Sequence, residues 1–187
     1  MSQDELVERF TLERVGASPA TFDCAKLDWM NGVYLRELPP DAHADTLIAY
    51  LRDQGSDWDE ARIRAAAPLV QEKIATLGEF ASFAGFLFHD VEPDPALLDR
   101  EILTAAADAL AAVEPFTAEQ IEAALKELCD RLGLKPRQAF QPIRVAVTGS
   151  KISPGLYESL ELLGRDESLA RLRGASGLSG ASGSSAR

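Results

Sequence analysis

Signals that start and stop α-helices recur along the whole chain, and they constrain its fold more than any other feature. Ser2-Gln3-Asp4-Glu5 and Thr117-Ala118-Glu119-Gln120 both have the capping-box pattern, ahead of apolar residues at helical spacing. Ser18-Pro19 places a cap residue before a proline that suits the first helical position. We therefore expect an all-α protein, built as a helical bundle or cage in two subdomains.

Further helices are expected between and after these signals. Pro68 begins or kinks one segment, Gly133 stops the helix that follows the second capping box, and Lys135-Pro136 prevents an immediate restart. Residues 145–147 also fit a strand, but we favour a helix because no partner strand is evident. The additional helices are expected at residues 41–54, 57–66, 96–113, 139–147, 154–163 and 166–173.

Two stretches interrupt the helical pattern. Residues 90–95 are acidic and contain two prolines, so they form a candidate boundary between two helical subdomains. Residues 174–187 consist almost entirely of Gly, Ser and Ala. Such a segment buries too little apolar surface to order itself, and we expect a disordered tail.

Charge is distributed unevenly. The chain carries 30 acidic and 19 basic side chains, for a net charge of −11, which by itself argues against contact with a polyanion. Residues 131–157 reverse this balance, because they contain no acidic side chain. The basic residues of this stretch are Arg131, Lys135, Arg137, Arg144 and Lys151. They form either a chance cluster that pairs with carboxylates elsewhere in the fold or a surface that faces an anion.

The residue types that carry out catalysis are not arranged as a site. Gly149-Ser150-Lys151 has the form of the end of a phosphate loop, but the earlier glycine of that motif would fall at Arg144. His43 and His89 lack the i, i+4 spacing of a zinc-binding helix, and we expect them at the surface or at helix ends. The sequence therefore predicts no catalytic residue, no metal site and no cofactor in this chain.

Other features bear on where the protein works. Cys24 and Cys129 are isolated in sequence, and both are expected to be buried thiols. The first ten residues are polar and amphipathic, unlike a signal peptide. No apolar run approaches the roughly 20 residues that cross a bilayer. We expect a cytoplasmic protein without a membrane partner.

Two segments have the composition of an RNA-contacting surface. Asn31, Tyr34 and Arg36 are able to hold a sugar or a phosphate, although the intervening glycine equally fits a close helix crossing. Residues 140–156 alternate prolines, glycines, small hydroxyls and cations. This mixture suits unstacked bases, because arginine forks onto base edges while hydroxyls and free N–H groups reach Watson–Crick edges. The second segment predicts a surface that reads the bases of an RNA loop.

Three segments carry a resemblance to a known family. They are residues 22–36, residues 84–88 and, above all, residues 141–164, which begin with Gln141-Pro142-Ile143-Arg144. In these segments, and in their order, the chain resembles the C-terminal part of bacterial glutamyl-tRNA synthetase, a class I aminoacyl-tRNA synthetase. The resemblance covers nearly all of residues 2–173.

The resemblance implies a division of the chain and a parent reaction. It implies a stem-contacting segment at residues 1–60, the first part of an anticodon-binding helical cage at 61–95 and a C-terminal anticodon-binding subdomain at 96–173, before the tail at 174–187. The parent reaction would be the ATP-dependent attachment of glutamate to tRNA. Its catalytic part, which would use ATP and Mg²⁺, has no counterpart among the matching segments.

Roles in reading the anticodon are also implied by the resemblance. Arg144 matches the family's anticodon-reading arginine, and Ser153, Pro154 and Leu156 match positions that pack on or hydrogen-bond anticodon bases. Lys73 matches a position where many members carry an arginine that discriminates the third anticodon base. Lysine lacks the planar fork of arginine, so strict discrimination of glutamate from glutamine anticodons is not implied.

The remaining assignments concern the tRNA stem and backbone. Asn31, Tyr34 and Arg36 match the family's stem-contact helix. The cations expected to supply charge to the tRNA backbone are Arg131, Lys135, Arg137 and Lys151.

We interpret the chain as a monomeric, non-catalytic portion of a glutamate–tRNA ligase. Its partner would be a glutamate tRNA, with glutamine tRNAs as further candidates. The alternative is a helical protein-interaction module that keeps the scaffold and binds another protein through its acidic faces. Removing the cations of residues 131–157 would weaken tRNA binding under the first interpretation only.

Overall fold

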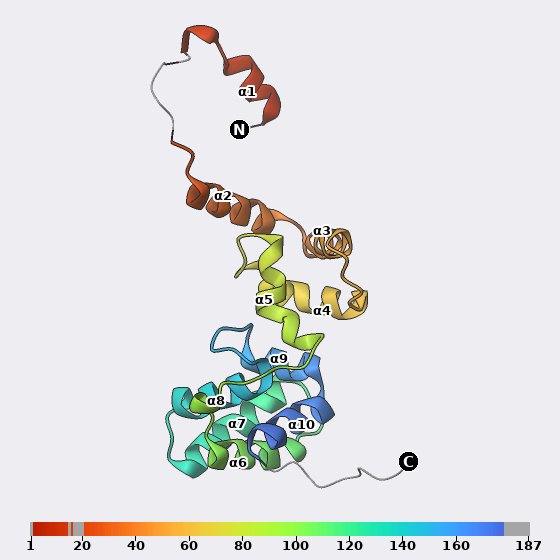
Figure 1. The fold of residues 1–187 in the computed structure, drawn as a ribbon, viewed down its shortest axis with the longest axis vertical. Helices are drawn as coiled ribbons and strands as arrows, with labels where there is room; N and C mark the ends of the chain where they lie inside the picture. The colour runs from red at the N-terminus through yellow and green to blue at the C-terminus, as the bar shows by residue number, and fades with distance from the viewer. Residues whose placement is uncertain (1, 15, 17–20, 178–187) are drawn as a thin grey trace.

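The computed structural model describes residues 2–14, 16 and 21–177, and within them the regular structure is entirely helical (Figure 1). The α-helices are α1 (Gln3–Arg9), α2 (Cys24–Glu37), α3 (Pro40–Asp53), α4 (Glu60–Gln71), α5 (Phe80–Ala84), α6 (Arg100–Ala111), α7 (Ala118–Leu132), α8 (Pro136–Thr148), α9 (Leu156–Leu163) and α10 (Arg165–Ala175). Short 3₁₀ turns are η1 (Leu12–Arg14), η2 (Leu77–Glu79), η3 (Gly85–Leu87) and η4 (Pro95–Leu97). The expected all-α class is confirmed, and residues 145–147 are helical.

The N-terminal helices begin at capping residues. The Ser2 hydroxyl accepts the Glu5 N–H at 3.2 Å, and the Glu5 carboxylate accepts the Ser2 N–H at 2.9 Å, so the expected capping box is confirmed. Helix α2 begins after Asp23, whose carboxylate accepts the Lys26 N–H at 3.0 Å. The expected helix start at Ser18-Pro19 lies outside the described residues. In Figure 1, α1 stands away from the rest of the chain.

The middle of the molecule is formed by α3, α4 and α5, with α2 lying across its outer end (Figure 1). Helices α3 and α4 pack on each other across position 60, where we expected a segment boundary. Gln71 of α4 donates from Nε2 to the carbonyls of Leu35 and Leu38, both at 2.9 Å, and so fastens the end of α2 to this layer. The domain limits drawn from the sequence stay predictions.

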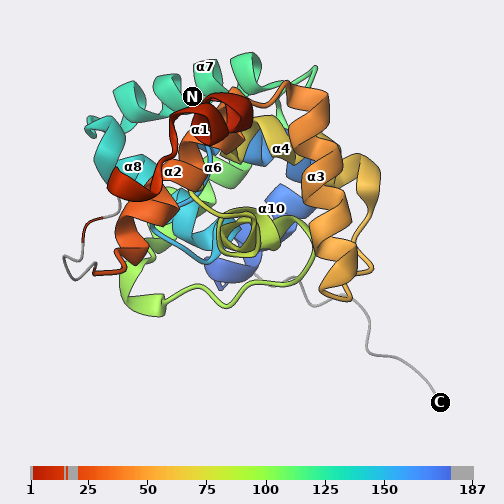
Figure 2. The same cartoon turned by 90° about the horizontal axis from the view of Figure 1, so that it is seen from above.

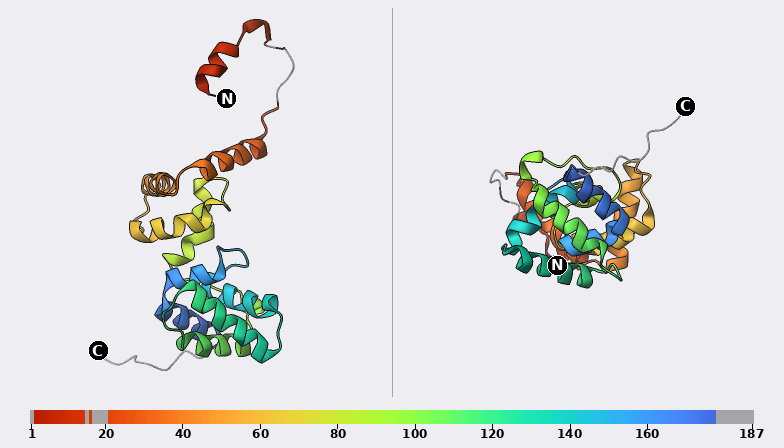
Figure 3. Two further views of the ribbon diagram at one scale, coloured as in Figure 1. Left: turned by 180° about the vertical axis from the view of Figure 1, so that it is seen from behind. Right: turned by 90° about the horizontal axis from the view of Figure 1, so that it is seen from below.

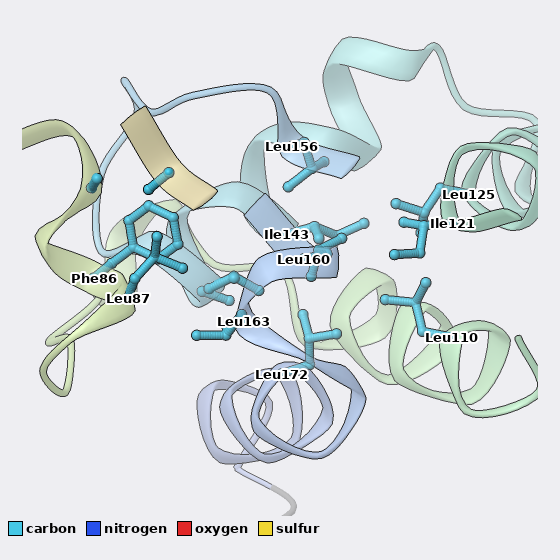
Figure 4. Packing of buried hydrophobic residues seen from close by; sticks show 14 of the residues in the cluster. Phe86, Leu87, Leu110, Ile121, Leu125, Ile143, Leu156, Leu160, Leu163 and Leu172 are labelled. Carbon is cyan, nitrogen blue, oxygen red and sulfur yellow. The ribbon is translucent and has the colours of Figure 1, made fainter. Parts of the chain in front are cut away.

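Helices α6 to α10 form the C-terminal subdomain, which lies below the middle helices when the molecule is viewed from behind (Figure 3, left) and beneath them when it is viewed from above (Figure 2). Side chains from all five helices converge on a common core (Figure 4). Six of the central ones are fully buried, namely Leu110, Ile121, Leu125, Ile143, Leu160 and Leu172. Each stabilises the fold by roughly 1.5–3 kcal/mol relative to an exposed position.

Prolines begin or enter helices where we expected them to separate helices. Pro136 is the first residue of α8, directly after Lys135 at the N-cap position, so the expectation that Lys135-Pro136 prevents an immediate restart was wrong. Pro68 lies inside α4 and does not begin a helix. A first-turn N–H has no partner within its helix, so a proline there costs nothing. Inside a helix, proline loses one bond that packing must offset.

Two further local expectations need correction. Thr117 occupies the N-cap position of α7, but its side chain makes no capping hydrogen bond. Helix α10 continues through Ala175, and Ser176 is buried with its hydroxyl donating to the Arg173 carbonyl at 2.9 Å. The expectation of a tail was therefore wrong at residues 174–176, and residues 178–187 lie outside the described part.

Burial corrects two expectations about titratable residues and confirms two. His43 is fully buried among the apolar residues of α3, and Cys24 is exposed, so both differ from what we expected. His89 is exposed and Cys129 is buried, as expected. Among the described residues, no helix combines the length and apolar character that crossing a bilayer requires.

Candidate nucleic-acid interface

One face of α8 forms an open cationic pocket. Arg137, Phe140, Gln141 and Arg144 follow the i, i+3, i+4, i+7 spacing that places side chains on one side of a helix. Together with Lys151 from the next loop, they line a pocket of about 370 Å³. Three of its five lining residues are cations, and Phe140 adds an aromatic ring. In a chain with a net charge of −11, this is a local concentration of positive charge.

The opposite face of α8 anchors the helix in the core. Ala139, Ile143, Ala146 and Val147 are buried, with at most 1% of each residue exposed. The start of the helix is fixed by Pro136 and by the Lys135 N–H, which donates to the Gln138 side chain at 3.0 Å. The pocket therefore sits on an element whose rotation is fixed by packing, which is what a recognition surface requires.

Arg144 joins α8 to the loop that follows it. Its Nη1 donates to the Ser153 hydroxyl, to the Ser153 carbonyl at 3.5 Å and to the Pro154 carbonyl at 2.7 Å. Within the part of the chain that the structure describes, Nε and Nη2 of Arg144 make no hydrogen bond. Nη1 of Arg144 therefore holds the loop, and the N–H groups of Nε and Nη2 are left to donate to a bound group.

The loop of residues 149–155 is ordered by its own small side chains. Gly149 ends α8 with φ of +71°, and its N–H donates to the Val145 carbonyl at 2.9 Å. The Thr148 hydroxyl accepts the Ser150 N–H at 3.3 Å, and the Ser150 hydroxyl accepts the Ile152 N–H at 3.1 Å. The residues on both sides of Lys151 are thus hydrogen-bonded to the residues before them, so Lys151 is presented from a defined backbone.

Electrostatics near the pocket are set by burial and by one acidic neighbour. Burial lowers the pKa of Arg144, and the negative charge of Glu158 opposes that shift. Burial also raises the pKa of Tyr157, whose ring meets Phe140 edge-on with centroids 5.8 Å apart. An arginine remains charged at neutral pH despite such a shift. Glu158, the residue that directly follows the acid-free stretch, therefore lies close enough to Arg144 to influence its pKa.

The structure brings together residues from two expected sets. Arg144 of the base-reading set shares the pocket with Arg137 and Lys151, the cations expected to face the tRNA backbone, and Ser153 and Pro154 lie against Arg144 and are buried. Leu156 differs, because its side chain belongs to the core and only 4% of the residue is exposed. From that position it supports the loop rather than presenting a surface to a base.

Other expected contacts lie elsewhere. Arg131 lines a groove between α6 and α7 together with Asp108 and Glu127, outside the cationic pocket. Lys135 is exposed at the N-cap of α8 and is not among the pocket-lining residues. Lys73 is exposed just after α4, two residues before Ala75.

The helix that carries the expected stem-contact residues meets that same turn at Asn31 and Gly32. Asn31 donates from Nδ2 to the Ala75 carbonyl at 2.5 Å, and Gly32 approaches Ala75 so closely that an added Cβ would lie 3.2 Å from its Cα. The glycine therefore does serve a close helix crossing. Tyr34 is 63% exposed and Arg36 is partly buried beside Gly32. Lys73 is two residues from this contact and is not among the residues that line the cationic pocket.

Two lining residues, Phe140 and Gln141, lie in the segment 140–156 that we expected to read bases, but they were not named individually as site residues. The helix expected here began at residue 139, so Arg137 fell outside it. The face that Arg137 shares with Phe140, Gln141 and Arg144 was therefore not recognised. The signal was present in Lys135-Pro136, because proline at the first helical position extends the helix to include all four residues. Among the described residues, no group of three or more His, Cys, Asp or Glu side chains is placed to hold a metal ion.

Comparison with known proteins places this architecture. A solved glutamate tRNA ligase from Elizabethkingia meningosepticum matches with a TM-score of 0.79 at 20% identity, over 95% of this chain and 37% of that chain. The helical fold is therefore the one found in part of that ligase. The family model described as "Anticodon binding domain" matches residues 42–176.

Curated relatives agree with this placement. A glutamate–tRNA ligase of Acidothermus cellulolyticus is 48% identical over 199 residues, covering 97% of this chain and 40% of the relative. One of Saccharopolyspora erythraea is 47% identical over 186 residues, covering 91% of this chain and 37% of the relative. The chain thus spans about two fifths of the length of the curated relatives that it matches. It belongs to the anticodon binding domain family and corresponds to the anticodon-binding region of glutamate–tRNA ligases.

Proposed function

We propose that this chain binds the anticodon arm of a glutamate tRNA, as the RNA-recognising portion of a glutamate–tRNA ligase, and that it performs no chemistry by itself. The observation that carries the proposal is the pocket of Arg137, Phe140, Gln141, Arg144 and Lys151 on one face of α8. Cations beside an aromatic ring suit a phosphate backbone with an unstacked base, because the ring offers a stacking surface and the cations neutralise charge. Family membership and the names of the relatives support the same assignment.

Several finer statements belong to this proposal. The chain acts as a monomer in the cytoplasm, where tRNA is charged, and it holds no cofactor. ATP and Mg²⁺ would be used by the portion of the ligase that this chain does not span. Arg144, held in place by Ser153 and Pro154, contacts the anticodon bases, and Lys73 contacts the third of them. Asn31, Tyr34 and Arg36 of α2 contact the stem.

Titrating a fluorescent anticodon stem-loop RNA of glutamate tRNA against the chain at several salt concentrations tests the proposal. Arg137→Gln combined with Lys151→Gln removes two pocket charges, and the slope of log K against log salt should fall by about 2. Arg100→Gln combined with Arg173→Gln is the matched control, because both residues are exposed and neither lines the pocket. The control should bind like the wild type.

Three results would contradict the proposal. Equal losses in the two double variants would show that binding follows total charge rather than the pocket. Absence of binding by the wild type at low salt would favour the alternative, a helical module that binds another protein. Aminoacylation by the isolated chain would overturn the statement that it performs no chemistry.

A further inference from the structure

Arg171 of α10 is the most heavily bonded cation outside the cationic pocket among the described residues. Its side chain is 11% exposed, and Nε donates to the Glu167 carboxylate at 2.7 Å. Nη1 donates to the carbonyls of Phe86 at 2.9 Å and Val147 at 2.8 Å. Nη2 donates to the His89 carbonyl at 3.3 Å. One guanidinium therefore engages three backbone carbonyls and a carboxylate.

These carbonyls belong to two segments that meet at Arg171. Phe86 and His89 lie in and just after η3, in the stretch that leads from the middle helices to the C-terminal subdomain. Val147 lies in the last turn of α8, where carbonyls have no partner within their own helix. Arg171 supplies that missing donor and places a positive charge at the negative end of the helix.

The end of α8 held by Arg171 is also where the pocket loop begins. Gly149 follows two residues after Val147, and a Cβ at Gly149 would lie 3.2 Å from the Cβ of Val91. Val91 is two residues after His89, whose carbonyl Arg171 also binds. The start of the loop is therefore enclosed between the connecting segment and α8, and Arg171 bonds to both.

We propose that Arg171 is a positioning residue for the cationic pocket: it fastens the last turn of α8 to the segment of residues 86–91 and thereby fixes the loop that carries Lys151 and Ser153. This inference rests on the proposed function for its consequence in RNA recognition. Lysine cannot replace arginine here, because a single ammonium lacks the planar fork that reaches several acceptors at once. Because Arg171 is largely buried, its effect on RNA comes through loop geometry rather than through a phosphate contact.

Arg171→Lys tests the inference in the full chain, because it keeps the charge and removes the fork. The matched control is Arg165→Lys, which alters an arginine of the same helix that instead bonds to the Val113 carbonyl and the Glu114 carboxylate. Both variants should lower the unfolding temperature slightly. All comparisons are made well below that temperature, so that every protein is folded.

The first measurement needs no RNA. Amide hydrogen exchange at Gly149 and Ser150, followed by nuclear magnetic resonance, should be roughly 3- to 10-fold faster in Arg171→Lys and unchanged in Arg165→Lys. Unchanged exchange at these amides in Arg171→Lys would overturn the inference. So would equal acceleration in both variants, because that would indicate a general loss of stability.

The second measurement compares the affinities for two stem-loops, one with a glutamate anticodon and one with altered anticodon bases. The ratio of these affinities should fall roughly 3- to 10-fold in Arg171→Lys, with the salt slope unchanged and the ratio preserved in Arg165→Lys. If the wild type binds neither RNA, the proposed function fails and the exchange measurement still decides the role of Arg171. A preserved ratio in Arg171→Lys would show that Arg171 does not position the pocket.

Discussion

Helices α1 and α2 and the C-terminal helices α6 to α10 begin with the same kinds of signals, yet they differ in what they bury. No residue of α1 is buried, and in α2 only Gly32 and Leu35 are. Of the ten exposed large hydrophobic side chains among the described residues, all but Ile152 lie between Leu6 and Tyr34. Helices α6 to α10 each bury between three and six residues, and all of the buried apolar ones except Val145 belong to a common core.

The difference separates helix formation from stability. Capping and apolar periodicity predict a helix in both regions, but an isolated helix shorter than about 12–15 residues is marginal in water. Burial of the apolar face is what makes a helix contribute to the folding free energy. The C-terminal subdomain is therefore expected to control global unfolding, and α1 to contribute little.

A core and an exposed leucine provide the largest contrast between these regions. Leu160 is fully buried in α9, so Leu160→Ala should lower the free energy of unfolding by about 3 kcal/mol through lost burial and a residual cavity. Leu6 is 53% exposed in α1, so Leu6→Ala should change it by less than about 0.5 kcal/mol. Guanidinium unfolding followed by circular dichroism measures both values. Similar costs at the two positions would refute the contrast.

His43 provides a test of how the middle helices contribute to stability, because it is a titratable residue in α3. Its ring is fully buried in α3, and neither ring nitrogen has a hydrogen-bond partner among the described residues. Burial lowers the pKa of His43 below its ordinary value of 6.5. As the pH falls below about 6.5, the unfolded chain therefore binds a proton that the folded chain refuses. Stability present above that pH is lost progressively until the folded pKa is reached.

We expect His43 to add a pH dependence of at most about 1.4 kcal/mol per pH unit to the free energy of unfolding. Urea unfolding between neutral pH and pH near 5 measures it, and His43→Leu should flatten the curve. His89→Gln is the matched control, because His89 is exposed. A curve that flattens in the His89 variant, or in neither, would argue against a buried neutral His43.

Much of the fold follows from the sequence because helix signals are local. The helices after Gly55, Gly133 and Gly164 were all anticipated, and each of these glycines has a positive φ. Errors arose at Pro136, which begins a helix, and at Pro68, which lies inside one and does not begin it. Proline only excludes a hydrogen bond and a range of φ, so its effect depends on its position in the helix.

The candidate site was only partly predictable, because charge is visible in a sequence and burial is not. Arg137, Arg144 and Lys151 stood out as cations in an acid-free stretch, and the structure places them in one pocket. The burial of Leu156 and the distance of Arg131 from that pocket are set by how α9 and α7 pack. Such tertiary facts leave no local pattern, and Arg171 shows the same limitation.

Two N-caps test the comparison on its smallest scale. The Asp99 carboxylate accepts the Ile102 N–H at 3.0 Å at the start of α6, which packs into the core. Asp99→Ala should therefore lower the free energy of unfolding by about 1 kcal/mol, and Asp99→Asn should restore most of it.

Ser2 caps α1 in the same way, but no residue of α1 is buried. Ser2→Ala should speed amide exchange within α1 and leave global unfolding unchanged within about 0.3 kcal/mol. A loss of about 1 kcal/mol from Ser2→Ala would mean that α1 unfolds together with the rest of the molecule, and the separation between the two regions would not hold.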